Sequence, residues 1–169
     1  MSAFSENVRM VSVDDYLLFL DEVLDDMVRI VTELGDELVN QRPDVPDTNS
    51  PYAILTHCLG VMEYWAGYMV AGRSIKRDRA AEFRAAGPVG ELVDRTVRAR
   101  HQLRLDLANL EPFAPPRGHP KHQEDAGLPM HKTQGGALIH AYEDLARHRG
   151  QMEITRDMIH VSVRKSGQT

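Results

Sequence analysis

Apolar and polar positions follow a helical period in several long segments of the chain. Ser12 is a suitable N-cap, and Asp14 and Asp15 follow it where a helix N-terminus favours negative charge. Apolar residues then recur at steps of three and four, at Leu17, Leu20, Leu24, Met27, Val31, Leu34 and Leu38. This pattern predicts a long helix with one continuous apolar seam, ending before Pro43.

A second helix is predicted between Ser50 and Gly72. Ser50 would cap it, and Pro51 takes the first helical position, where its missing N–H costs nothing. The expected apolar face consists of Leu55, Cys58, Met62, Trp65 and Met69. Three aromatic side chains of this segment are interpreted as packing residues, with the lining of a pocket as the alternative: Tyr64, Trp65 and Tyr68.

The third and fourth predicted helices cover residues 86–112 and residues 133–161. The third should turn its arginines outward and bury Leu92, Val93, Val97, Leu103, Leu107 and Leu110. The fourth has a seam at Leu138, Ala141, Leu145, His148, Met152, Thr155 and Ile159. Between them, residues 111–132 are rich in proline and glycine, which excludes a helix or a central strand and predicts a long loop.

These segments together predict an all-α protein, a four-helix bundle with a long Pro-rich loop between helices 3 and 4. A length of 169 residues with 42% apolar and 27% charged residues suits one domain, covering 1–169, with its core at about 12–161 and a disordered tail at 162–169. No run of 18 apolar residues is present, and the first ten residues lack the features of a signal peptide. A cytoplasmic protein is therefore expected.

Charge and cysteine content narrow the function classes. The formal net charge of −5 argues against nucleic acid as the main partner, and the basic stretch from Arg73 to Arg104 is interpreted as a solvated helix face. The single cysteine, Cys58, cannot form an internal disulfide. It points away from His57 on the predicted helix and is interpreted as a buried apolar contact.

His140, Asp144 and His148 form a polar row at steps of four on the last predicted helix. His148 falls on the apolar seam and Asp144 at its border, where an unpaired carboxylate would cost several kcal/mol. His57, at the edge of the second helix's apolar face, is the candidate third ligand of a metal held with Asp144 and His148. Two imidazoles and one carboxylate resemble the ligand sets of catalytic zinc and non-haem iron sites. The alternative is a hydrogen-bonded core histidine and a helix-stabilising Asp–His pair.

The other histidines are interpreted as lying outside such a centre. His140 is further from the seam and is expected to support a ligand or lie at the surface. The loop histidines His119, His122 and His131 have no helical register and no cysteine nearby, so a structural zinc site is not predicted there.

Two stretches carry a family resemblance. "SPYAILTHCLGVMEYWAGYMVAGR" and "LIHAYEDLARHRGQMEITRDMI" resemble the DinB-like four-helix bundles, a superfamily that includes thiol S-transferases of the YfiT type and mycothiol-dependent maleylpyruvate isomerase. Such proteins typically bind a divalent metal through one histidine of the second helix and two ligands four residues apart in the last, followed by an H-x-G-x signature. The resemblance implies His57, Asp144 and His148 as ligands and "HRGQ", from His148 to Gln151, as the signature.

Asp144 departs from the usual pattern of these relatives. Many have histidine at this position, and the isomerase branch has a carboxylate, normally glutamate. Aspartate is one methylene shorter, so the last helix would need to lie closer to the ion.

The resemblance implies a metal-dependent thiol S-transferase. Zinc is expected, with nickel, manganese or iron as alternatives, and the metal would stabilise the thiolate of a low-molecular-weight thiol such as mycothiol, which attacks an electrophilic small molecule. Thiol-dependent isomerisation of the maleylpyruvate type is one alternative, although those isomerases carry an extra C-terminal domain. A non-catalytic ligand-binding or dimerisation bundle is another. Exposed apolar helix faces favour a homodimer without indicating which face pairs.

Overall fold

The computed structural model describes residues 11–120 and 127–166, and within these ranges it contains helices and no strand. In chain order the elements are α1 (Val13–Leu38), α2 (Pro51–Met62), the π-helix η1 (Glu63–Val70), α3 (Arg79–Glu82), α4 (Val89–Asp106), the 3₁₀ turn η3 (Pro129–His131) and α5 (Gln134–Ser166). Because η1 continues α2, the long elements are four, and the predicted all-α bundle is confirmed.

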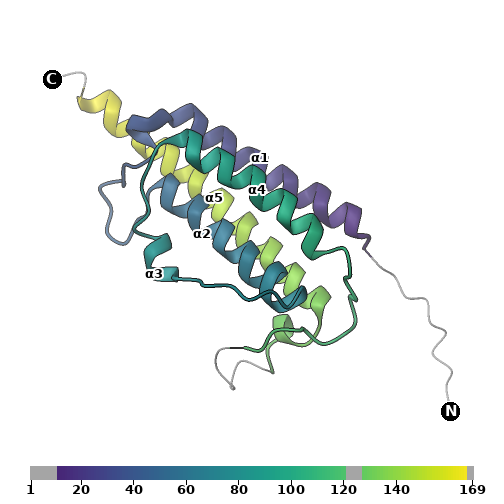
Figure 1. Ribbon diagram of the computed structural model, residues 1–169. Helices are drawn as coiled ribbons and strands as arrows, with labels where there is room; N and C mark the ends of the chain where they lie inside the picture. The colour runs from purple at the N-terminus through teal and green to yellow at the C-terminus, as the bar shows by residue number, and fades with distance from the viewer. Residues whose placement is uncertain (1–10, 121–126, 167–169) are drawn as a thin grey trace, which may run out of the picture.

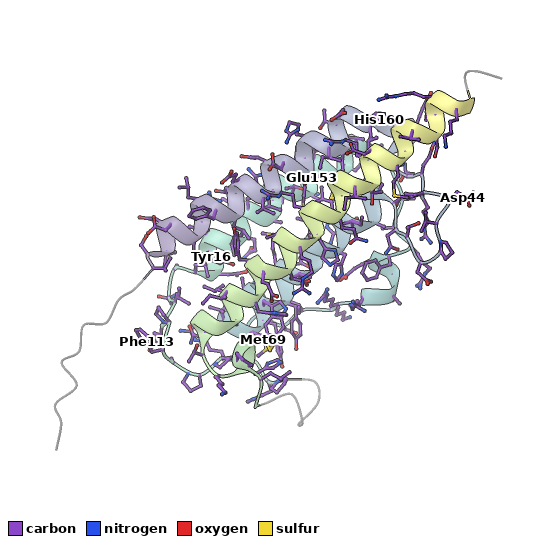
Figure 2. The ribbon with its side chains drawn as sticks, turned by 180° about the vertical axis from the view of Figure 1, so that it is seen from behind. Tyr16, Asp44, Met69, Phe113, Glu153 and His160 are labelled. Atoms are coloured by element: carbon purple, nitrogen blue, oxygen red, sulfur yellow. The ribbon has the colours of Figure 1, made fainter. Side chains whose placement is uncertain are left out.

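The two helices α1 and α2 contact each other as well as the other long helices. Both α1 and α2 pack on α4 and on α5, while α4 and α5 make no mutual contact within the described residues. Figure 1 shows α1 and α5 running in the same direction, with α2 and α4 running in the opposite direction. Figure 2, from behind, shows α5 crossing the whole bundle beside α1. The antiparallel neighbours α2 and α5 therefore bring their central residues together.

The predicted helix caps are confirmed. The Ser12 hydroxyl accepts a hydrogen bond from the Asp15 N–H at 3.0 Å, and the Ser50 hydroxyl accepts one from the Ala53 N–H at 3.3 Å. Gly72 follows the end of η1 with a φ of +74°, a backbone conformation that favours glycine. α1 also contains a kink at Gly35, with a φ of +63°, which the apolar periodicity did not predict.

The bundle core follows the predicted seams closely. Of the predicted α1 seam, the buried members are Leu20, Leu24, Met27, Val31 and Leu34. Every residue of α2 is buried, as expected of a helix that is apolar on nearly all sides. Cys58 is fully buried among apolar side chains, as predicted. On α5 the predicted seam is buried except for His148, which is half-buried.

The predicted apolar face of the third helix is confirmed only in part. Val97, predicted to face the core, has 61% of its surface exposed, and Val93 is only half-buried. Leu92, Leu103 and Leu107 are buried as predicted, and Thr96, which was not predicted, is buried as well. On the side toward α1, Arg100 and Arg104 of α4 both pair with Asp21, a contact that the sequence pattern does not encode.

Three further elements differ from the sequence expectations. α5 continues to Ser166, so residues 162–166 are helical instead of a disordered tail, and Arg164 and Lys165 suit the negative end of the helix dipole. Residues 167–169 lie outside the described residues. The basic link contains the short α3, and η1 has the wide turns of a π-helix, with the Ala71 N–H donating to the Ala66 carbonyl at 2.9 Å.

Among the described helices, none has a stretch apolar and long enough to span a membrane.

Candidate metal centre

The structure brings His57 of α2 together with Asp144 and His148 of α5. One ligand atom from each lies within 4.8 Å of the others, and this is the group of three potential ligands found in the described part of the chain. His57 Nε2 lies 3.9 Å from Asp144 Oδ2, and His148 Nε2 lies 3.6 Å from Asp144 Oδ1. Ligands about 2.0–2.1 Å from a tetrahedral zinc stand roughly 3.3 Å apart. Small side-chain adjustments would therefore close these three residues around an ion.

Both histidines have their Nδ1 atom occupied by an oxygen acceptor. His57 Nδ1 lies 2.8 Å from Glu82 Oε2, and His148 Nδ1 lies 2.8 Å from Gln151 Oε1. A carboxylate or amide oxygen only accepts, so each Nδ1 carries a proton and donates, and Nε2 is the ring nitrogen left to face a metal. Both Nε2 atoms lie beside Asp144. This is the tautomer in which an imidazole ligates a metal through Nε2.

Glu82 is itself held by Arg77. Arg77 Nε donates to Glu82 Oε1 at 2.7 Å and Arg77 Nη2 donates to Glu82 Oε2 at 3.0 Å. Burial raises the pKa of Glu82, but hydrogen bonds from Arg77 and His57 outweigh burial and lower it overall. Glu82 is therefore ionised at neutral pH and acts as an acceptor for His57. The short helix α3, capped by Asp78, ends at Glu82 and sets its position.

His57 lies in a closed environment. Only 2% of its surface is exposed, and its ring stacks on Phe83 with the centroids 4.4 Å apart. Burial lowers the pKa of His57, and the hydrogen bond to Glu82 opposes burial only in part. The imidazole is therefore neutral at pH 7, as a metal ligand must be.

The centre is accessible from the α5 side, because Asp144 and His148 are only half-buried. One turn before Asp144, His140 packs edge-on against Trp65 at a centroid distance of 4.7 Å, and Trp65 also contacts His131 at 5.1 Å. His140 is thus absent from the ligand group. It forms an aromatic cluster with Trp65 and His131 instead.

Of the loop histidines, His119 and His131 are absent from the ligand group. His119 is exposed, and His122 lies outside the described residues.

Tyr64 and Trp65 are buried, and Tyr64 and Tyr68 also line a surface cavity, so both interpretations of the aromatic residues hold in part.

Glu82, Arg77 and the role of Gln151 were missed by sequence reasoning. Gln151 stands three residues after His148, a spacing that places both side chains on one helix face and could have indicated the contact. Glu82 and Arg77 have no such signal, because they reach His57 from a largely non-helical segment.

The fold and this grouping define a DinB-like four-helix bundle with a candidate His–Asp–His metal centre. The chain belongs to the mycothiol-S-transferase family, whose family model matches residues 16–160. That range includes all three residues of the candidate centre, and the predicted DinB-like relationship is confirmed. A comparison with curated proteins finds none that matches this chain.

Proposed function

We propose that this protein is a metal-dependent S-transferase that joins mycothiol, or a closely related thiol, to an electrophilic small molecule. Membership of the mycothiol-S-transferase family supports the transferase class and the thiol. The observation that carries metal dependence is the convergence of two Nε2 atoms on Asp144, with both imidazoles held in the ligating tautomer by Glu82 and Gln151.

In this proposal His57, Asp144 and His148 hold the metal. The bound ion would supply Lewis acidity, which makes the thiolate form of a coordinated thiol available at neutral pH. Glu82 and Gln151 keep the two imidazoles oriented, and Phe83 covers the His57 ring. The transfer forms a bond between the thiol sulfur and an electrophilic carbon while the bond from that carbon to its leaving group breaks. The leaving group takes the bonding electron pair, and the thiol proton goes to solvent or to the leaving group.

The nucleophilic sulfur comes from the small thiol and not from the protein. Cys58 is fully buried, and burial raises the pKa of its thiol. It therefore stays protonated and out of reach of a substrate.

We propose zinc as the metal, because two imidazoles and a carboxylate suit it and leave a position for the thiol. Nickel, manganese and iron also accept this donor set and are alternatives. The carboxylate of Asp144, the ligand type of the isomerase branch, makes thiol-dependent isomerisation the second candidate function.

The test is metal content per chain, measured by mass spectrometry on untagged protein. The variant is Asp144→Ala, and the matched control is Asp157→Ala on the same helix, where Asp157 pairs with its neighbour Arg156 and with no other described residue. We expect about one equivalent in wild type and control, and little in Asp144→Ala. Transfer of mycothiol to a bromobimane should cease on metal removal and return when the metal is restored.

A contrary outcome has a clear meaning. If wild type takes up no zinc, nickel, manganese or iron, Asp144 and His148 are a helix-stabilising pair and the non-catalytic bundle becomes the better explanation. Full metal binding without thiol transfer would leave the centre intact and contradict the transferase.

A further inference from the structure

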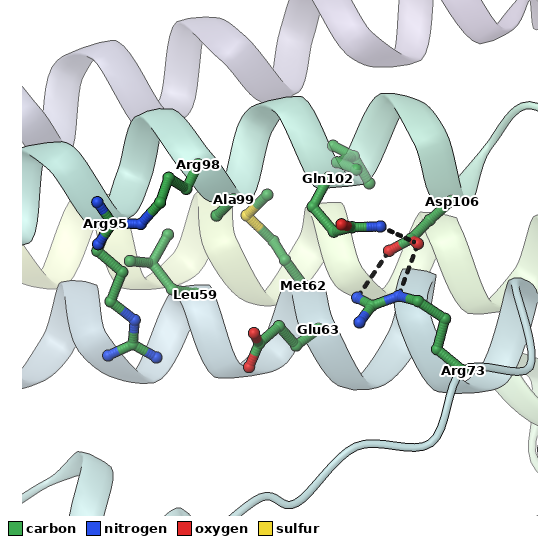
Figure 3. A pocket seen from close by; sticks show the side chains of 10 residues that line it. Leu59, Met62, Glu63, Arg73, Arg95, Arg98, Ala99, Gln102 and Asp106 are labelled. Carbon is green, nitrogen blue, oxygen red and sulfur yellow. Dashed lines mark hydrogen bonds and ion pairs between the residues drawn. The ribbon is translucent and has the colours of Figure 1, made fainter.

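A cavity separate from the candidate metal centre lies between the α2–η1 helix and α4. None of the three candidate ligands lines it. Its volume is about 430 Å³, within the range of small-molecule sites. Figure 3 shows its interior, where Leu59 and Met62 face Ala99 across the groove and polar side chains surround them. The cavity thus combines an apolar floor with a charged rim.

The arginines of α4 divide into two sets. Arg100 and Arg104 turn toward α1 and form ion pairs with its aspartates. Arg95 and Arg98 line the groove, and neither has an ion pair or a hydrogen bond within the described residues. One helix therefore pairs its guanidinium groups on the α1 side and carries two without an ion pair beside a cavity that Glu63 also lines. Guanidinium groups bind carboxylate and phosphate oxygens through paired N–H donors.

The far end of the groove is a rigid, neutral wall. Arg73 binds Asp106 through two hydrogen bonds, of 2.7 and 2.9 Å, and Gln102 donates to the same carboxylate at 2.9 Å (Figure 3). Only 5% of the Asp106 surface is exposed. Gly67 makes room for this pair, because a Cβ there would stand 2.4 Å from Arg73 Nη2. The positive charge available to a ligand is therefore concentrated at the Arg95 end.

An adjoining cavity of about 300 Å³ extends the groove at that end. Arg95 and Glu63 line both cavities. The second cavity also includes Thr56, which is 5% exposed and whose hydroxyl oxygen is buried with no hydrogen-bond partner within the described chain. A buried hydroxyl without a partner costs free energy that a bound polar group would recover.

We propose that this groove is a binding site for a small organic anion. The acidic group of the ligand, a carboxylate or a phosphate, binds Arg95 and Arg98. Its apolar part lies on Leu59, Met62 and Ala99, and a polar atom of the ligand satisfies the Thr56 hydroxyl. None of the three candidate metal ligands lines the groove, although Arg77 and Glu82, which hold His57, line the adjoining cavity beside Thr56.

The test uses two small aryl anions, phenyl phosphate and benzoate, titrated into the full chain at low salt by calorimetry. The groove variant is Arg95→Gln/Arg98→Gln, and the control Arg100→Gln/Arg104→Gln removes equal charge from the α1 side of the same helix. We expect affinity for the preferred anion to fall about tenfold or more in the groove variant and to change less than about twofold in the control.

A third variant, Ala99→Leu, keeps every charge and fills the apolar floor, so it should also weaken binding. Unfolding midpoints of all variants verify that they fold, and Arg104→Gln alone serves as control if the double control is unstable. Equal loss in both double variants, no effect of Ala99→Leu, or no saturable binding of either anion to wild type would each overturn the proposal.

Discussion

Gly60 and Glu82 lie so close together that a Cβ atom on residue 60 would stand 2.1 Å from Glu82 Oε1. Real Cβ atoms essentially never approach other heavy atoms closer than 3.0 Å. Gly60 stands on α2 three residues after His57, the partner of this same carboxylate. A glycine in the middle of a helix thus opens the space through which Glu82 reaches the candidate metal ligand.

Gly60→Ala should weaken metal binding. The added methyl group would push the Glu82 carboxylate away from His57 Nδ1, and loss of such a supporting partner typically costs 10- to 100-fold in metal affinity. Competition with a chromophoric chelator measures this. Gly90→Ala is the control, because a Cβ there meets nothing within 4 Å. If Gly60→Ala binds metal as tightly as Gly90→Ala, the Glu82 contact does not support the centre.

Gln151 should support His148 in the same way. Gln151→Leu removes the oxygen that accepts from His148 Nδ1, and we expect metal affinity to fall about tenfold. Gln151→Glu keeps an acceptor at the same position and should retain most of the affinity. The same chelator competition compares the two variants, and equal affinity in both would show that this hydrogen bond does not orient the imidazole.

Cys58 should be chemically silent in the folded protein. Since its side chain is fully buried and burial raises the pKa of its thiol, a disulfide reagent such as DTNB should react only after denaturant is added. Cys58→Ala should retain thiol transfer while losing about 1 kcal/mol of unfolding free energy through the lost packing. Rapid reaction of the native thiol, or loss of transfer in a folded Cys58→Ala protein, would contradict this assignment.

The metal-free protein should lose stability as the pH falls below about 6.5, the ordinary pKa of histidine. Burial lowers the pKa of His57, despite its hydrogen bond to Glu82, in a site that also contains Arg77, Asp144 and His148. Between this lowered pKa and 6.5 the unfolded chain takes up a proton that folded His57 refuses, so stability decreases there by at most about 1.4 kcal/mol per pH unit. Above pH 6.5 the imidazole of His57 is neutral in both the folded and the unfolded chain, so its contribution to the free energy of unfolding no longer changes with pH.

Urea unfolding in the presence of a chelator, at a series of pH values, measures the effect. Other histidines titrate in the same range, so the relevant quantity is the difference between wild type and His57→Gln. That difference should shrink toward acid pH. A difference independent of pH would mean that His57 is as readily protonated in the folded protein as in the unfolded chain.

The helices could be predicted because their signals are local. The seam of α1, the caps Ser12 and Ser50 and the stop at Gly72 each depend on residues within a few positions of one another. The candidate site was predictable where it repeats along a helix, as Asp144 and His148 do. The exposure of Val97 on α4 was not, since it has the same local pattern as a core valine and its exposure depends on how α4 packs against α1 and α2.

The sequence by itself determined the four long helices, the apolar seams of α1 and α5 and the polar row on α5. Only the tertiary structure decided that Glu82 and Arg77 hold His57, that Gly60 makes room for them, and that Arg95 and Arg98 border a groove without acidic partners. The physical reason is that helix formation and amphipathicity repeat every turn. The contacts of Arg77 and Glu82 with His57 depend on the path of the irregular segment between η1 and α3, which no periodic pattern encodes.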